Sequence, residues 1–117
     1  MSAGELSEKI SLRKISNFNM FVRIIDSYRY IVAICDSDLL GKRFEEGRFQ
    51  LDVKESFYKG DEKSENETIE LLRKMTREDA SFNIVGKKSV RAALKAGIIS
   101  EESVGKIQGV EFALVLL

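Results

Sequence analysis

Residues 18–35 read FNMFVRIIDSYRYIVAIC, and this stretch decides the fold class. Phe18–Ile25 is a near-continuous run of β-branched and aromatic residues, typical of a strand that is buried on one face and partly covered on the other. Residues 26–29 (Asp-Ser-Tyr-Arg) have the composition of a turn, and Tyr30–Cys35 resembles a returning strand. The stretch therefore predicts an antiparallel β-hairpin.

The hydrophobic period changes from two to 3.6 near Glu65. Residues 49–53 alternate with period two and predict a third strand, which ends in a glycine turn at residues 57–61. From Glu65 the apolar spacing is helical, and residues 83–86 suit the end of that helix, because asparagine and glycine tolerate a left-handed backbone. A second helix is predicted over residues 87–96, ending at Gly97. The apolar residues 110–117 predict a last, buried strand.

The predicted order is β-β-β-α-α-β, which defines an α+β domain with a mainly antiparallel sheet and two helices packed on it. We expect the last strand to join the sheet of the first three. Residues 18–117 form the single predicted domain, because 117 residues fit one domain. Residues 1–17 predict a mobile or loosely docked N-terminal extension. Residues 59–67 predict a charged linker.

Composition excludes several classes of function. The chain has no histidine, which removes imidazole acid–base chemistry and most zinc sites, and its one cysteine cannot form a disulfide framework. The 19 basic and 19 acidic residues cancel, so no global field attracts nucleic acid or a membrane. No apolar run is long enough for a membrane span and no secretory signal opens the chain, so we expect a cytoplasmic protein without a cofactor.

A basic stripe on the second predicted helix is the strongest functional candidate. Its members are Lys87, Lys88, Arg91 and Lys95, in nine residues that contain no acid. Positions 87, 91 and 95 share one helix face, so the stripe, with an exposed helix N-terminus at Gly86, could hold phosphates of RNA. A solvated helix face explains the same residues, and no arginine–aromatic interleaving accompanies the stripe.

Two further clusters have structural as well as chemical interpretations. Asp36 and Asp38, with Glu45 and Glu46 nearby, could bind a hard cation. Capping aspartates are common, so the favoured interpretation is that Asp36 ends a strand and Asp38 caps the turn at Leu39 and Leu40. Residues 86–89 (Gly-Lys-Lys-Ser) match only the end of a P-loop, since Ser81 stands where the first glycine is required.

The apolar candidates favour core positions. Cys35 lies within an apolar strand and has no histidine to act as its base, so a buried thiol is expected. Phe57, Tyr58 and Phe82 could stack on bases if exposed, although aromatic residues at the ends of elements more often belong to the core edge.

Four motifs carry a resemblance to a known family. They are Cys35-Asp36-Ser37-Asp38-Leu39-Leu40-Gly41-Lys42, Phe57-Tyr58-Lys59-Gly60, Asn83-Ile84-Val85-Gly86 and the late Val110. Their order and spacing, over about residues 18–116, resemble the small archaeal proteins of domain-of-unknown-function family 424. The family-like positions are Asp36, Asp38, Gly41, Lys42, Tyr58, Gly60, Asn83 and Gly86, most of which are turn and cap residue types.

The resemblance implies an archaeal cytoplasmic protein without an established activity, in the context of information processing such as translation. Members carry a proline–histidine pair after the late glycine–valine, whereas Glu111-Phe112 follows Gly109-Val110 here. Any chemistry of that histidine is therefore absent, which favours a protein that is not an enzyme.

Three hypotheses follow from these residues. The first is a non-enzymatic module that binds RNA or a ribonucleoprotein through the basic stripe. The second is a protein–protein adaptor or self-associating domain that uses the apolar strand of residues 112–117 as an edge. The third is a metal-dependent enzyme or small-ligand site around Asp36 and Asp38.

Overall fold

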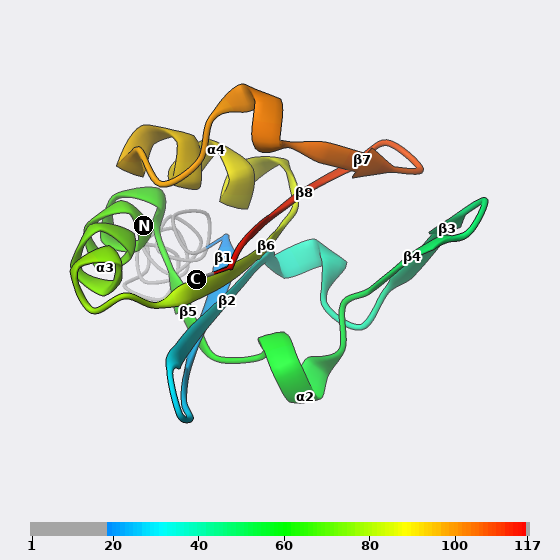
Figure 1. Ribbon diagram of the computed structural model, residues 1–117. Coiled ribbons are helices and arrows are strands. Elements are labelled where there is room, and N and C mark those ends of the chain that lie inside the picture. Colours follow the sequence, from blue (N-terminus) through cyan, green and yellow to red (C-terminus); the bar gives the residue numbers. More distant parts are fainter. Residues whose placement is uncertain (1–18, 117) are drawn as a thin grey trace, which may run out of the picture.

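The structure is a computed structural model that describes residues 19–116 (Figure 1). The strands are β1 (Met20–Asp26), β2 (Tyr30–Asp36), β3 (Arg43–Glu46), β4 (Phe49–Asp52), β5 (Asp61–Lys63), β6 (Ser81–Val85), β7 (Gly105–Ile107) and β8 (Val110–Val115). The helices are α2 (Glu55–Tyr58), α3 (Glu65–Arg77) and α4 (Lys87–Ala96), with two 3₁₀ turns, η1 (Ser37–Leu39) and η2 (Glu101–Ser103). The predicted N-terminal extension lies outside the described residues.

One six-stranded sheet organises the fold, with the strand order β5-β1-β2-β6-β8-β7. Strands β2 and β6 are parallel, and the other neighbours in this sheet are antiparallel. A separate two-stranded sheet consists of β3 and β4. The α+β class and the mainly antiparallel sheet are therefore confirmed.

Helices α3 and α4 cover one face of the sheet (Figure 1). Alternate residues of β2 and β6 point to this face, including Val32, Ile34, Phe82 and Ile84, and all four are buried. They pack against Leu72 of α3 and its neighbours in one apolar cluster. The burial of this cluster is the main source of stability, because each buried aliphatic or aromatic side chain contributes about 1.5–3 kcal/mol.

The opposite face is covered by α2 and the segment around it (Figure 1). Cys35 and Val85 point to this side and pack in a second cluster with Val53 and Tyr58. The Arg23 guanidinium donates a hydrogen bond to the carbonyl of Ser56 in α2. The sheet therefore separates two apolar layers, and neither face of its central part is open.

Several predictions about local structure are confirmed. Strands β1 and β2 form the predicted antiparallel hairpin in full register from Met20 to Asp36. Helix α3 begins at Glu65, where the Ser64 hydroxyl accepts a hydrogen bond from the Glu67 N–H at 3.3 Å and the Glu67 carboxylate accepts one from the Ser64 N–H at 3.1 Å. This reciprocal capping explains the sharp helix start. Helix α4 spans the predicted residues and ends at Gly97, whose φ is +78°.

Other predictions are wrong. The strand predicted over residues 49–53 does not join the main sheet, because β4 pairs with β3 in a projecting hairpin (Figure 1). The predicted linker contains β5, which pairs with β1 at one edge of the sheet. The last strand is only half buried, since Ala113 is 1% exposed whereas Leu114 is 53% exposed. No helix among residues 19–116 has the length and apolarity needed to cross a membrane.

The prediction for residues 83–86 is also wrong, and it matters most for the site. Asn83 lies in the middle of β6, paired with Ala33 on one side and Leu114 on the other, and not at a helix end. Because β6 runs parallel to β2, the carboxyl ends of the two neighbouring strands lie side by side at the same end of the sheet. Asp36 and Gly86 are therefore brought together.

Candidate functional site

The four basic side chains of α4 lie on the outside of the molecule. Lys87, Lys88, Arg91 and Lys95, named here the α4 stripe, are exposed. The opposite side of the helix is buried through Ser89, Val90, Ala92 and Ala93. The sequence therefore predicted the placement of these side chains correctly.

The N-terminus of α4 is not exposed, which corrects one expectation. The Asp36 carboxylate, only 6% exposed, accepts hydrogen bonds from the backbone N–H of Lys88 at 3.1 Å and of Ser89 at 2.8 Å. The Ser89 hydroxyl donates a further bond to it at 2.7 Å. A carboxylate from β2 thus occupies the position that a phosphate would take at a free helix N-terminus. Any anion that binds α4 has to bind its side chains.

Gly86 is required by this arrangement. Its φ of +107° and ψ of 152° fall in a region open almost only to glycine. A Cβ atom at this position would lie 2.3 Å from the Asp36 Cγ. The family-like positions Asp36 and Gly86 are therefore explained as two halves of one structural contact.

An acidic residue of α3 partly neutralises the α4 stripe. The Glu65 carboxylate lies 3.7 Å from the Arg91 Nε and also pairs with the Lys95 Nζ. The Arg91 and Lys95 side chains are about half exposed, so each ion pair contributes little to the free energy of unfolding. Sequence spacing did not reveal this contact, because Glu65 and Arg91 are on different helices.

The remaining family-like positions have architectural contacts. The Gly41 N–H donates to the Val53 carbonyl at 2.7 Å, and the Lys42 carbonyl accepts from the Val53 N–H at 2.9 Å, so both residues anchor the base of the β3–β4 hairpin. At Gly60, a Cβ atom would lie 2.3 Å from the Val22 carbonyl oxygen, so only glycine allows this approach of the chain to β1. Asn83 is half-buried within β6.

The acidic candidates do not assemble into one site. Both carboxylate oxygens of Asp36 are engaged by α4, whereas Asp38 is exposed in η1. Asp38 lies inside η1, and the N-cap residue of this turn is Asp36, so the predicted role of Asp38 as a cap is wrong. Glu45 and Glu46 lie on the projecting hairpin, where the Glu46 carboxylate accepts from the Gln108 N–H. Within residues 19–116, no three acidic or cysteine side chains are grouped as metal ligands.

The aromatic candidates are not stacking platforms. Phe82 is 1% exposed and Tyr58 is 6% exposed, in the two apolar layers on opposite faces of the sheet. Phe57 packs edge-on against Tyr58 with ring centroids 5.0 Å apart. Among residues 19–116 the exposed aromatic side chains are instead Tyr28, Tyr30 and Phe49, which no sequence motif indicated.

Cys35 is a buried thiol, as expected. Burial, with smaller contributions from the negative charges of Asp36 and Asp38, raises its pKa to about 12. Burial also raises the pKa of the Tyr58 phenol to about 12, with a smaller contribution from Cys35. Both groups are therefore protonated at neutral pH, and the thiol is not a nucleophile.

We expect the stability to fall as the pH rises above about 9. The unfolded chain releases these protons near the ordinary pKa values of 9.0 and 10.0, while the folded protein keeps them until about pH 12. The folded state then binds more protons, so the free energy of unfolding decreases with pH in this window. Urea unfolding at several pH values measures the decrease. The variant Cys35→Ala with Tyr58→Phe should show a smaller decrease, and an equal decrease in both proteins would contradict the assignment.

The fold and the capped helix define a class of protein: a small α+β domain with two helices on one face of a mixed six-stranded sheet. The chain belongs to the family DUF424, described as a protein of unknown function, which it matches over residues 25–117. Its fold is similar to that of an uncharacterized conserved protein from Methanopyrus kandleri, with a TM-score of 0.75 and 22% sequence identity over 82% of this chain and 89% of that chain. No curated protein matches the chain.

Proposed function

We propose that the protein is a non-enzymatic binding module that contacts RNA or a ribonucleoprotein through the α4 stripe. The observation that carries this proposal is the charge on that face. Four exposed cations lie on that face, and one acid, Glu65, pairs with two of them. The face therefore has an excess of three positive charges. A local excess of this kind attracts a polyanion even though the whole chain is neutral.

The length of the stripe sets the scale of the contact. Lys87 and Lys95 are eight residues apart on one helix, which corresponds to about 12 Å along the helix axis. Each strand of a duplex advances about 3.4 Å per nucleotide along the helix axis, so with this spacing the stripe spans roughly three to four phosphates. Because Asp36 occupies the helix N-terminus, these contacts come from side chains and depend strongly on salt.

The test is the salt dependence of RNA binding. Replacing Lys87, Arg91 and Lys95 together with alanine should weaken the binding of a short RNA and reduce the slope of log K against log salt by about three units, one for each phosphate that the variant no longer neutralises. Fluorescence anisotropy between about 50 and 200 mM salt measures this slope. An unchanged slope would exclude the stripe.

Two further variants act as controls. Alanine at Arg48, Lys54 and Lys106 removes the same charge from exposed positions outside α3 and α4, and should leave the slope almost unchanged. Glu65→Gln releases Arg91 and Lys95 from their partner and should strengthen RNA binding, with a slope steeper by about one unit. Weaker binding by Glu65→Gln would contradict the proposed role of the two cations.

The proposal includes a cytoplasmic location. Cys35 is the single cysteine of the chain, and its thiol is buried without a partner for a disulfide. This use of cysteine fits a reducing compartment. A role in translation is the context that we propose for such a ribonucleoprotein contact.

The second candidate function is that of an adaptor or self-associating domain. The observation that favours it is the outer edge of β8, where β7 pairs only as far as Phe112. Beyond that point, Leu114 is 53% and Leu116 is 73% exposed. An edge strand with exposed leucines can accept a strand from a partner. Sedimentation over a range of concentrations tests self-association, and Leu114→Lys should abolish it.

A further inference from the structure

The tip of the β1–β2 hairpin, residues 26–30, carries two exposed tyrosines on either side of Arg29. Tyr28 is fully exposed at 103%, and Tyr30 is 38% exposed although it lies in a strand. Ile24, 43% exposed, is a diagonal neighbour of Tyr30 on the same face of the hairpin, because Ile24 pairs with Val32. The tip therefore exposes two aromatic rings and one aliphatic side chain beside the polar residues 26, 27 and 29.

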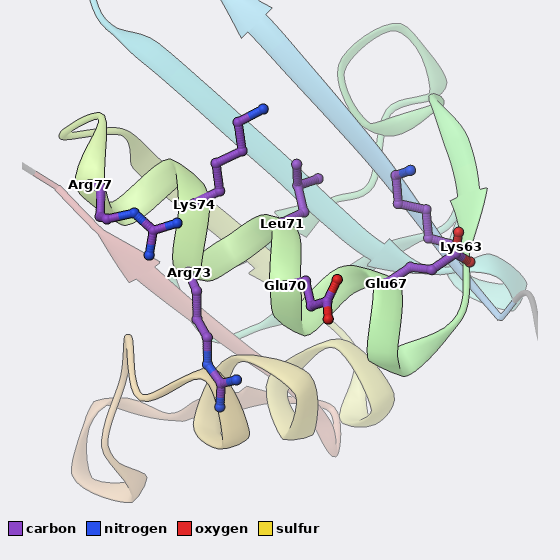
Figure 2. Close-up of a pocket in the computed structure, with 7 residues that line it drawn as sticks. All are labelled: Lys63, Glu67, Glu70, Leu71, Arg73, Lys74 and Arg77. Carbon is purple, nitrogen blue, oxygen red and sulfur yellow. The ribbon is translucent and has the colours of Figure 1, made fainter.

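The tip lies at the same end of the sheet as the C-terminal part of α3. Strand β6 begins at Ser81, level with Ile31, so the turn that follows α3 and the tip are at one end. The last two turns of α3 carry Arg73, Lys74 and Arg77 and no acid. Figure 2 shows Leu71 and Lys74 pointing to the side where β1 and β2 run, whereas Arg73 points to α4.

One of these cations links α3 to the α4 stripe. The Arg73 guanidinium donates a hydrogen bond to the carbonyl of Lys95 at 3.2 Å. An open hollow on α3 is lined by Leu71, four cations and two acids, which leaves an excess of two positive charges; the charged residues are Lys63, Arg73, Lys74, Arg77, Glu67 and Glu70. A second hollow, which shares Lys63 and Leu71 and also contains Asp61, reaches Ile24. A strand of RNA that follows the α4 stripe can therefore continue over α3 to the tip.

Charge alone does not hold a ligand at the tip. Arg29, Arg73, Lys74 and Arg77 are opposed at this end by Asp26, Glu78 and Asp79, all of them exposed. The net attraction for phosphate is therefore much weaker than on the α4 stripe. Stacking on the tyrosine rings has to supply the affinity at the tip, and stacking requires bases that are not paired in a duplex.

We infer that Tyr28 and Tyr30 stack on bases of single-stranded RNA whose phosphates lie along the α4 stripe. This inference rests on the proposed function and specifies its substrate as single-stranded. The two contacts have different signatures. Loss of stripe charge changes the salt slope, whereas loss of a tyrosine ring lowers affinity at every salt concentration.

The experiment uses a labelled oligouridine, an RNA duplex of the same length and the full chain. The wild type should bind the single strand more tightly than the duplex. Tyr28→Ala should weaken single-strand binding by about 5- to 100-fold, as for the loss of one stacked base, with the salt slope and duplex binding unchanged. Tyr28→Phe keeps the ring and should bind as the wild type. Phe49→Ala, which removes a 71% exposed ring from the β3–β4 hairpin, should also bind normally.

The outcomes separate the inference from the proposed function. If the triple alanine variant of the stripe flattens the slope while Tyr28→Ala binds as the wild type, the inference is wrong and the proposed function stands. Equal affinity of the wild type for single strand and duplex also overturns the inference. If the wild type binds neither RNA at low salt, both the inference and the proposed function are wrong. Since Tyr28 is fully exposed, its replacement should not affect folding.

Discussion

Replacing Phe82 with alanine should lower the free energy of unfolding by about 3–5 kcal/mol, the range for loss of a buried aromatic side chain. Phe82 is 1% exposed and is the largest fully buried side chain among the described residues. It lies in β6, between β2 and β8, and packs under the helices with Leu72 and Ile84. The cavity left by alanine has strands on both sides, so it cannot close by a small shift of an edge. Urea denaturation followed by circular dichroism measures the change.

Phe49→Ala is the matched control for this prediction. It makes the same chemical change at a side chain that is 71% exposed, so the free energy of unfolding should change by no more than about 0.5 kcal/mol. Similar losses in the two variants would show that β6 is not the central strand. A Phe82→Ala variant with the free energy of unfolding of the wild type would also contradict the central position of Phe82 in the apolar cluster.

Gly86→Ala should be the second severe substitution, with a loss of at least about 3 kcal/mol. The backbone conformation of Gly86 costs about 1–3 kcal/mol for any other residue, and the new methyl group would overlap the buried Asp36 carboxylate. The overlap cannot be relieved without breaking the hydrogen bonds that the carboxylate accepts from Lys88 and Ser89. Thermal and urea unfolding of the variant measure the loss.

A double-mutant cycle with Asp36→Ala isolates the contact. Alone, Asp36→Ala leaves two N–H groups of α4 without an acceptor and should cost about 2–3 kcal/mol. In the double variant the overlap is gone, so the combined loss should be smaller than the sum of the single losses by about 1–3 kcal/mol. If the two losses in free energy of unfolding simply add, Gly86 and Asp36 do not interact energetically. Gly97→Ala is the control, since Gly97 also has a positive φ but no atom near its missing Cβ, and should be additive with Asp36→Ala.

Local patterns predicted the first hairpin and both long helices. The two strands of the hairpin, Met20–Asp26 and Tyr30–Asp36, are close in sequence and pair with each other. Helix α4 has a glycine at each end, which marks its bounds. Such signals lie within a few residues of the structure that they predict. The exposure of the α4 side chains was predicted for the same reason, because a spacing of four residues places side chains on one helix face.

Strand β6 was missed because its signal is short and follows a helix. Residues 81–85 alternate Phe82 and Ile84 with Ser81 and Asn83, which is a period of two, but the asparagine and the glycine after it also match a helix end. Its role as a central strand depends on parallel pairing with β2, about fifty residues earlier in the chain. No local pattern encodes which distant strand will be the neighbour.

The sequence by itself determined the α+β class, the exposed cations of α4 and the absence of histidine chemistry, because composition and periodicity act at short range. Only the tertiary structure decided what these elements meet. Parallel pairing of β2 and β6 brought Asp36 to the N-terminus of α4, and helix packing brought Glu65 to Arg91 and Lys95. The α4 helix therefore lacks a free N-terminal anion site and retains only its side-chain charges, a result of contacts between residues far apart in the chain.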